Sequence, residues 1–217
     1  MKKNLRLFLL DNYDSFTFNL AHQITSVAQN ILLKEGSGLT TELVIKRNDE
    51  ISIEEIISFN PTCLFISPGP GKPETSGILL DLLNTLGQLP YHMTMPIFGV
   101  CLGHQALIAA EGGNVGPAKE PLHGVATTIR LVNHAHPLLL NLPSTMTVGR
   151  YHSLIATPPI PKCYLTLAYS EQDEVMAIAH KSRPWWGVQF HPESFLTEQG
   201  DRIIHNVLNL AREHWCQ

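Results

Sequence analysis

Apolar and polar residues follow two alternating patterns through the first half of the chain. Short continuous apolar runs are typical of strands covered on both faces, and such runs cover residues 5–10, 43–45, 63–66 and 96–100. Between them, apolar residues recur every three or four positions, as in an amphipathic helix. This spacing predicts helices that begin near residue 16 and cover residues 53–59, 78–86 and 105–110. Strands that alternate with helices predict a mostly parallel, open sheet with helices on both faces.

The pattern changes after Gly112 and Gly113. Residues 126–131 and 163–168 are short stretches rich in threonine and apolar residues, which predicts a small antiparallel sheet beside the main one. A last buried strand is expected over 185–190, and a closing helix over about 199–215. Weak periodicity over 29–41 predicts a surface excursion before the second strand. Because the chain shows no internal repeat or low-complexity tract, we expect residues 1–217 to form a single α/β domain.

Composition narrows the function classes. The 217 residues carry a formal net charge of −4, without a run of like charges, so we expect no nucleic-acid partner. No apolar segment approaches the length of a membrane span, which predicts no membrane partner. The cysteines are far apart and lack metal-ligand or disulfide spacing, a usage that predicts a cytoplasmic protein. They are Cys63, Cys101, Cys163 and Cys216.

The most informative stretch is the run that ends in Gly99-Val100-Cys101-Leu102-Gly103. A strand that turns sharply into a helix can present a nucleophile on a strained turn, a nucleophile elbow, with small residues two positions before and after it. A helix N-terminus also favours the thiolate of a cysteine. The alternative is a buried structural cysteine, since free cysteine is among the most buried residue types.

A base for this cysteine is available near the end of the chain. His191 and Glu193 are two residues apart, so both side chains project from the same side of an extended segment. Glu193 could orient the imidazole and leave its other nitrogen for Cys101. The pair follows a predicted buried strand, and sites in open α/β sheets gather at the carboxyl ends of the strands.

The third requirement is a pair of donors for a developing oxyanion. The amide of Leu102 opens the predicted elbow helix, and the loop Gly69-Pro70-Gly71 follows another predicted strand. Proline has no N–H, so Gly71 is a better donor candidate than Pro70. The alternative for this loop is a rigid connector without a binding role.

These segments resemble a known family. Residues 98–105 (Phe-Gly-Val-Cys-Leu-Gly-His-Gln) and 189–194 (Gln-Phe-His-Pro-Glu-Ser) resemble motifs of the class I, triad-type glutamine amidotransferases. Further motifs resemble the glutaminase subunits of anthranilate synthase and aminodeoxychorismate synthase, and they occur in that family's order over nearly the whole chain. They cover residues 10–17, 67–71, 123–124 and 150–154.

The resemblance implies a flavodoxin-like α/β fold and a specific reaction. Cys101 would attack the side-chain amide of L-glutamine, His191 would act as base and then acid, and Glu193 would orient it. Ammonia would pass to a separate synthase subunit that binds chorismate and Mg²⁺, while this chain would need no cofactor or metal. The residues that match glutamine-binding positions of the family are Gly69, Pro70, Gly71, Gln105, Ser153 and Leu154.

Three departures from the family pattern concern the partner interface more than the chemistry. Glu111 replaces an aromatic residue, Val125 a lysine, and Gly149 a threonine or alanine. Residues 34–39 also add length to a connection that is usually shorter. The first choice of function is the glutaminase subunit of anthranilate synthase, and the alternative is that of aminodeoxychorismate synthase, or a subunit shared by both. Rivals from other classes are a non-enzymatic binding module and a stand-alone cysteine hydrolase.

Other possible ligands or nucleophiles are expected to be inert. His134 and His136 have the spacing of two metal ligands on one strand face, but no carboxylate or cysteine completes a set. They are expected in an exposed loop. Cys63 belongs to a core strand, and Cys163 has no histidine pattern near it in the sequence.

Overall fold

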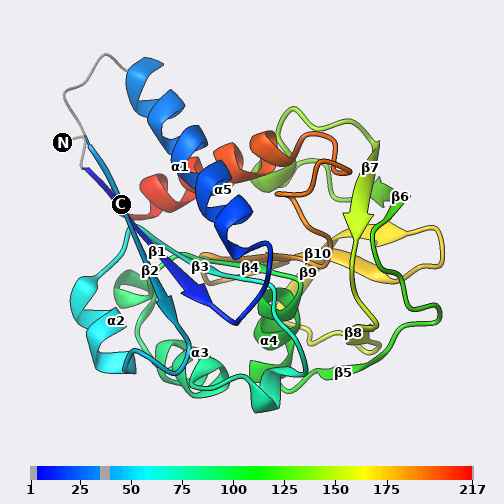
Figure 1. Cartoon of the computed structure of the whole chain (residues 1–217), viewed down its shortest axis with the longest axis horizontal. Coiled ribbons are helices and arrows are strands. Elements are labelled where there is room, and N and C mark those ends of the chain that lie inside the picture. The colour runs from blue at the N-terminus through cyan, green and yellow to red at the C-terminus, as the bar shows by residue number, and fades with distance from the viewer. Residues whose placement is uncertain (1–3, 35–39, 217) are drawn as a thin grey trace.

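A nine-stranded sheet forms the centre of the computed structural model, which describes residues 4–34 and 40–216 (Figure 1). One half of the sheet is parallel, in the order β2-β1-β3-β4-β11. Its strands are β1 (Leu5–Asp11), β2 (Thr41–Arg47), β3 (Cys63–Ile66), β4 (Ile97–Val100) and β11 (Trp185–Val188). The prediction of a mostly parallel α/β sheet is therefore confirmed for this half.

Helices cover both faces of the parallel strands, as predicted. In Figure 1, α1 and α5 lie on one face, and α2, α3 and α4 lie on the other. Each face has its own hydrophobic core, because the apolar strands contribute side chains to both sides. The helices are α1 (Thr17–Lys34), α2 (Ile53–Phe59), α3 (Leu79–Gly87), α4 (Leu102–Ala110) and α5 (Gly200–His214).

The antiparallel strands were only partly predicted. We expected them in a small sheet beside the main one, but four of them extend the main sheet, in the order β10-β9-β6-β7 from β11 outward. In the described part of the chain, β5 and β8 alone form a separate two-stranded antiparallel sheet. The bounds are β5 (Asn114–Pro117), β6 (Val125–Leu131), β7 (Thr145–Arg150), β8 (Leu154–Thr157), β9 (Tyr164–Ser170) and β10 (Val175–His180).

Two predicted boundaries were wrong. Residues 29–34 were expected in a surface excursion but form the last turns of α1, where Ile31 and Leu32 are buried. Packing of these side chains in the core stabilises helix where the sequence periodicity is weak; residues 35–39 lie outside the described part of the chain. The last strand ends at Val188 instead of residue 190, because the chain turns there toward the loop that contains His191.

The described residues also form three short 3₁₀ helices: η1 (Pro73–Thr75), η2 (Tyr91–Met93) and η3 (Pro137–Leu139). Within residues 4–34 and 40–216, no helix is long and apolar enough to cross a membrane. The carboxyl ends of β1, β3, β4 and β11 lie at one edge of the sheet, since these strands are parallel neighbours. The segments that follow them form the candidate site.

Candidate active site

Cys101 occupies a strained turn between β4 and α4. Its backbone has φ 52° and ψ −99°, a conformation that non-glycine residues adopt rarely and at a cost. A Cβ on Gly99 would lie 2.4 Å from the carbonyl carbon of Gly103, and a Cβ on Gly103 would lie 2.7 Å from the backbone oxygen of Ile66. Both flanking positions therefore admit only glycine, and the predicted elbow geometry is confirmed.

The elbow is fixed to the neighbouring strand. The backbone N–H of Cys101 donates to the carbonyl of Val188, the last residue of β11, at 2.8 Å. The segment that continues from β11 carries His191, so this bond brings the two halves of the predicted pair together. The Cys101 side chain is almost enclosed, with 7% of the residue exposed.

His191 and Glu193 form a tight pair. The imidazole Nδ1 lies 2.6 Å from Oε1 of Glu193, and the side chains of both residues are almost fully buried. The backbone N–H of His191 donates to the carbonyl of Gly149 at 3.1 Å. A Cβ on Gly149 would lie 2.8 Å from Oγ of Ser194, so the glycine at this position leaves room for the turn after the pair.

The environment of His191 favours its charged form. Burial alone lowers the pKa of the imidazole, but the side chains of Cys101 and Glu193 outweigh burial and raise the pKa to about 10. An imidazolium between a thiolate and a carboxylate is the charge arrangement expected of an activated cysteine. The rings of Tyr151 and Phe16 contact the imidazole edge-on, with centroids 4.9 and 6.0 Å from it.

The loop 67–73 lies against the elbow, as the sequence predicted. A Cβ on Gly69 would lie 2.8 Å from Cδ2 of Leu102 and 2.4 Å from the backbone oxygen of Asn12. The side chain of Asn12 donates to the carbonyl of Ser67, and Asn48 donates in turn to the side chain of Asn12. Gly69 is therefore held close to the start of α4.

The remaining predicted residues lie on two sides of the elbow. Nε2 of Gln105 donates to the carbonyl of Leu154 at 2.8 Å, which joins α4 to the start of β8. Ser153 is exposed and its carbonyl accepts from the N–H of Ala118. Pro70 and Gly71 lie toward the surface, and Gly71 has φ +78°. The structure thus brings Gln105 and Leu154 into contact, and gives no direct contact between Ser153 and the His191–Glu193 pair.

Sequence reasoning missed a buried ion pair that involves Arg150, the last residue of β7. Arg150 pairs with Glu174 at very short range, and both side chains are buried. Nε of Arg150 also donates to Nε2 of His152 at 3.1 Å. Burial and the nearby Arg150 charge lower the pKa of His152 to about 3. The motif 150–154 contained Arg150 and His152, but Glu174 had no local signal.

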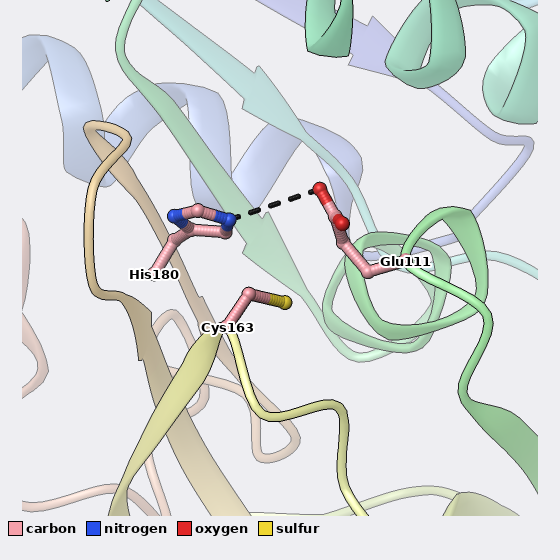
Figure 2. Close-up of side chains that lie close together, drawn as sticks. All are labelled: Glu111, Cys163 and His180. Carbon is pink, nitrogen blue, oxygen red and sulfur yellow. Dashed lines mark ion pairs between the residues drawn. The ribbon is translucent and has the colours of Figure 1, made fainter.

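A second cluster contains Cys163, which has no histidine pattern near it in the sequence but lies beside a histidine in the fold. Glu111, Cys163 and His180 bring their ligand atoms within 4.8 Å of one another (Figure 2). Nδ1 of His180, however, accepts from the backbone N–H groups of Ser182 and Arg183. The neutral ring therefore carries its proton on Nε2, which faces Glu111 at 3.7 Å.

This cluster does not fit a metal site. A ligating histidine needs a free lone pair on one nitrogen and usually donates the proton on the other, whereas the lone pair of His180 is already occupied by N–H groups. Burial, followed by the charge of Glu111, also raises the pKa of Cys163, so its thiol stays protonated. The trio is better described as a histidine–carboxylate pair beside an inert thiol.

The fold and the elbow with its neighbouring His–Glu pair have the architecture of a cysteine-dependent α/β enzyme. Residues 8–210 match the family described as glutamine amidotransferase class-I. The chain therefore belongs to the class-I glutamine amidotransferase family, and the resemblance seen in the sequence is confirmed. A crystal structure from Thermoplasma acidophilum, of a protein described as part of a GMP synthase, has a TM-score of 0.76 and 26% identity, covering 98% of this chain and 96% of that chain.

Curated relatives include components of two synthases. Anthranilate synthase component 2 of Azospirillum brasilense is 38% identical, over 95% of this chain and 96% of its own. Aminodeoxychorismate synthase component 2 of Escherichia coli is also 38% identical, over 94% and 99%. Aminodeoxychorismate/anthranilate synthase component 2 of Bacillus subtilis is 37% identical, over 95% and 97%.

Proposed function

We propose that this chain hydrolyses L-glutamine through Cys101, His191 and Glu193 and supplies the ammonia to a separate synthase component. The observation that carries the proposal is the 2.6 Å contact between His191 and Glu193, on the loop that follows the strand to which the Cys101 amide is bound. The contact fixes the imidazole with Nδ1 toward the carboxylate, and leaves Nε2 for the sulfur and the substrate.

The proposed reaction has two steps. The Cys101 thiolate forms a bond to the amide carbon of glutamine, the C–N bond breaks, and the proton on His191 Nε2 leaves with ammonia. A water molecule next loses a proton to His191 and attacks the thioester, which releases glutamate and regenerates the thiolate–imidazolium pair. Glu193 keeps its position throughout and stabilises the imidazolium.

Two backbone amides are proposed to bind the oxyanion. Leu102 is the first residue of α4, where backbone N–H groups have no partner within the helix. The N–H of Gly71, on the loop packed against Leu102 through Gly69, is the second donor. Gln105, Ser153 and Leu154, with Gly69 and Pro70, complete the set proposed to bind the rest of the glutamine.

The proposed partner is a chorismate-using synthase component, with anthranilate synthase as first choice. The names of the relatives support anthranilate synthase and aminodeoxychorismate synthase equally, because the chain is 38% identical to a component of each. The relative that carries both names supports a role in both synthases. Phe195, two residues after Glu193, is 92% exposed and is proposed to contact the partner. Any Mg²⁺ is proposed to bind the partner, and the complex to be cytoplasmic.

A reconstituted complex tests the proposal. With the anthranilate synthase component bound, Cys101→Ser should reduce glutamine-dependent anthranilate formation to background, while formation from ammonium salt remains at the wild-type rate. Cys216→Ser, at an exposed cysteine, is the control and should leave both activities unchanged. Glutamine-dependent activity in Cys101→Ser would contradict the assignment. Activity only with the aminodeoxychorismate synthase component would overturn the choice of partner but not the chemistry.

A further inference from the structure

Gln189 is a fully buried polar residue that the proposed mechanism has not used. It follows β11, none of its surface is exposed, and its backbone N–H donates to the carbonyl of Met176 on β10 at 2.9 Å. A buried side-chain amide is costly unless both of its ends are hydrogen-bonded. The two ends of this amide meet Gln105 and Cys101.

The orientation of the Gln189 amide is fixed by its neighbours. Nε2 of Gln105 donates to the carbonyl of Leu154, and a carbonyl can only accept, so this end of Gln105 must be its NH₂ group. The same NH₂ group lies 3.1 Å from Gln189, whose facing atom must therefore be the oxygen. The NH₂ group of Gln189 consequently points to Sγ of Cys101, at 3.5 Å.

A donor at this position distinguishes the two forms of the cysteine. Hydrogen bonds to an ionised acceptor are roughly twice as strong as those to a neutral one, so the amide stabilises the thiolate more than the thiol. The amide reaches the sulfur from the start of the segment 189–191, and His191 lies at the end of the same segment. The contact also restricts the position of the sulfur before it attacks the substrate.

We propose that Gln189 is a catalytic residue of this site, whose amide N–H binds the Cys101 sulfur, stabilises its thiolate form and holds it in place for attack. The proposal deepens the proposed function, since it concerns the same nucleophile. Gln105 then has a second role, because it fixes the direction of the Gln189 amide. A chain of two amides thus connects the start of β8 to the reacting sulfur.

Other titratable groups near the sulfur must be considered in any pH measurement. His191, with Glu193 behind it, is the charged partner of Cys101. His104 on α4 and His152 after β7 are also buried, and burial lowers their pKa values to about 4 and about 3. Both stay neutral between pH 5 and pH 9, so they add no charge that changes over this range.

The test measures Cys101 itself and needs neither glutamine nor a partner. The full chain is alkylated with iodoacetamide at a series of pH values between 5 and 9, and the rate at Cys101 is followed by peptide mass spectrometry. Gln189→Met keeps the length of the side chain and removes the donor. The pH midpoint of alkylation should rise by about one unit, which corresponds to the loss of one hydrogen bond to a charged group.

A second variant, Gln189→Glu, tests whether the shift comes from the lost donor and not from a folding defect. Gln189→Glu keeps an oxygen for Gln105 but puts a carboxylate beside the sulfur, so its midpoint should rise by more than that of Gln189→Met. The control is Asn206→Leu, because Asn206 is a buried amide on α5 that donates to the carbonyls of Leu138 and Leu140. It should leave the midpoint unchanged.

The outcomes separate the two proposals. A wild-type midpoint in folded Gln189→Met or Gln189→Glu would overturn the role of Gln189 and leave the glutaminase proposal intact. A shifted midpoint supports the role of Gln189, even if the reconstituted complex does not use glutamine.

Discussion

At the scale of single residues, the elbow shows how much a short motif can specify. Cys101 has a positive φ, and the glycines on either side face backbone atoms at distances that no Cβ tolerates. The same segment of backbone must therefore combine a non-glycine residue in a strained conformation with two residues that lack side chains. Strain of this kind persists only where the surroundings determine it.

Gly103→Ala should disable this arrangement. The added Cβ would lie 2.7 Å from the oxygen and 2.9 Å from Cβ of Ile66, so α4 must move away from β3. We expect a loss of about 1–3 kcal/mol in the free energy of unfolding, the usual cost of overpacking, together with loss of glutaminase activity. Gly87→Ala, whose Cβ would make an ordinary contact 3.6 Å from Trp185, serves as the control in urea unfolding and activity assays. Equal behaviour of the two variants would contradict this explanation.

The limits of sequence reasoning are also clear at this scale. Cys101, His191 and Glu193 stand in motifs with recognisable spacing, so they could be named without a structure. The role of Gln189 could not, because the direction of its amide depends on Gln105 and Leu154, which lie far from it in the sequence. The same holds for Cys163 and His180, which meet only because β9 and β10 are paired.

At the scale of elements, a network of amides positions the loop 67–73. Nδ2 of Asn48 donates to Oδ1 of Asn12 at 2.9 Å, and Nδ2 of Asn12 donates to the carbonyl of Ser67 at 3.0 Å. Asn48 follows β2, Asn12 follows β1 and Ser67 follows β3, so the network joins the ends of three neighbouring strands. The network therefore connects the loop 67–73 to the edge of the sheet.

Asn48→Ala should loosen this loop without touching the triad. Oδ1 of Asn12 would lose its donor in a buried place, which costs about 1–3 kcal/mol. Because Asn12 packs against Gly69, we expect kcat/KM for glutamine to fall by about tenfold in the complex, while ammonium-dependent synthesis is unaffected. Ser52→Ala is the control, since it removes the N-cap of α2 at a cost of about 1 kcal/mol, and the side chain of Ser52 bonds Glu55 and not the Asn48–Asn12–Ser67 network. A comparable fall in kcat/KM in the control would show that the effect is only one of stability.

Local sequence patterns predicted where helices and strands form better than they predicted which strands pair. The helix expected over residues 53–59 begins at a capping box of Ser52 and Glu55, and Asn60 ends it in a left-handed conformation. The end of α1 was missed because burial of Ile31 and Leu32 stabilises a weakly periodic segment. Antiparallel strands were expected near β6 and β9, but the place of these strands in the main sheet, with β7 and β10, depends on pairing between distant residues, which composition does not reveal.

At the scale of the whole molecule, the protein buries histidines that must stay neutral. His104 has no hydrogen-bond partner for either ring nitrogen among the described residues, and burial lowers its pKa to about 4. His152 lies beside Arg150, and burial together with that charge lowers its pKa to about 3. In the unfolded chain both would titrate near 6.5.

The sign of the resulting pH dependence follows from proton binding. Below pH 6.5 the unfolded chain gains protons on these two histidines that the folded protein does not accept, so the free energy of unfolding falls as the pH falls. His191 does not oppose this, because its pKa is raised and it is protonated in both states below pH 6.5. Its own contribution to stability is complete below that pH and is lost only as the pH rises toward about 10.

The free energy of unfolding should therefore fall by about 2–4 kcal/mol between pH 7 and pH 5, since each histidine contributes about 1.4 kcal/mol per pH unit below 6.5. Urea unfolding at both pH values, followed by circular dichroism, measures the difference. His152→Gln keeps an acceptor for Arg150 and removes one titrating group, so its fall should be smaller than that of the wild type by about 2 kcal/mol. Equal falls in the variant and the wild type would mean that His152 is not buried in its neutral form.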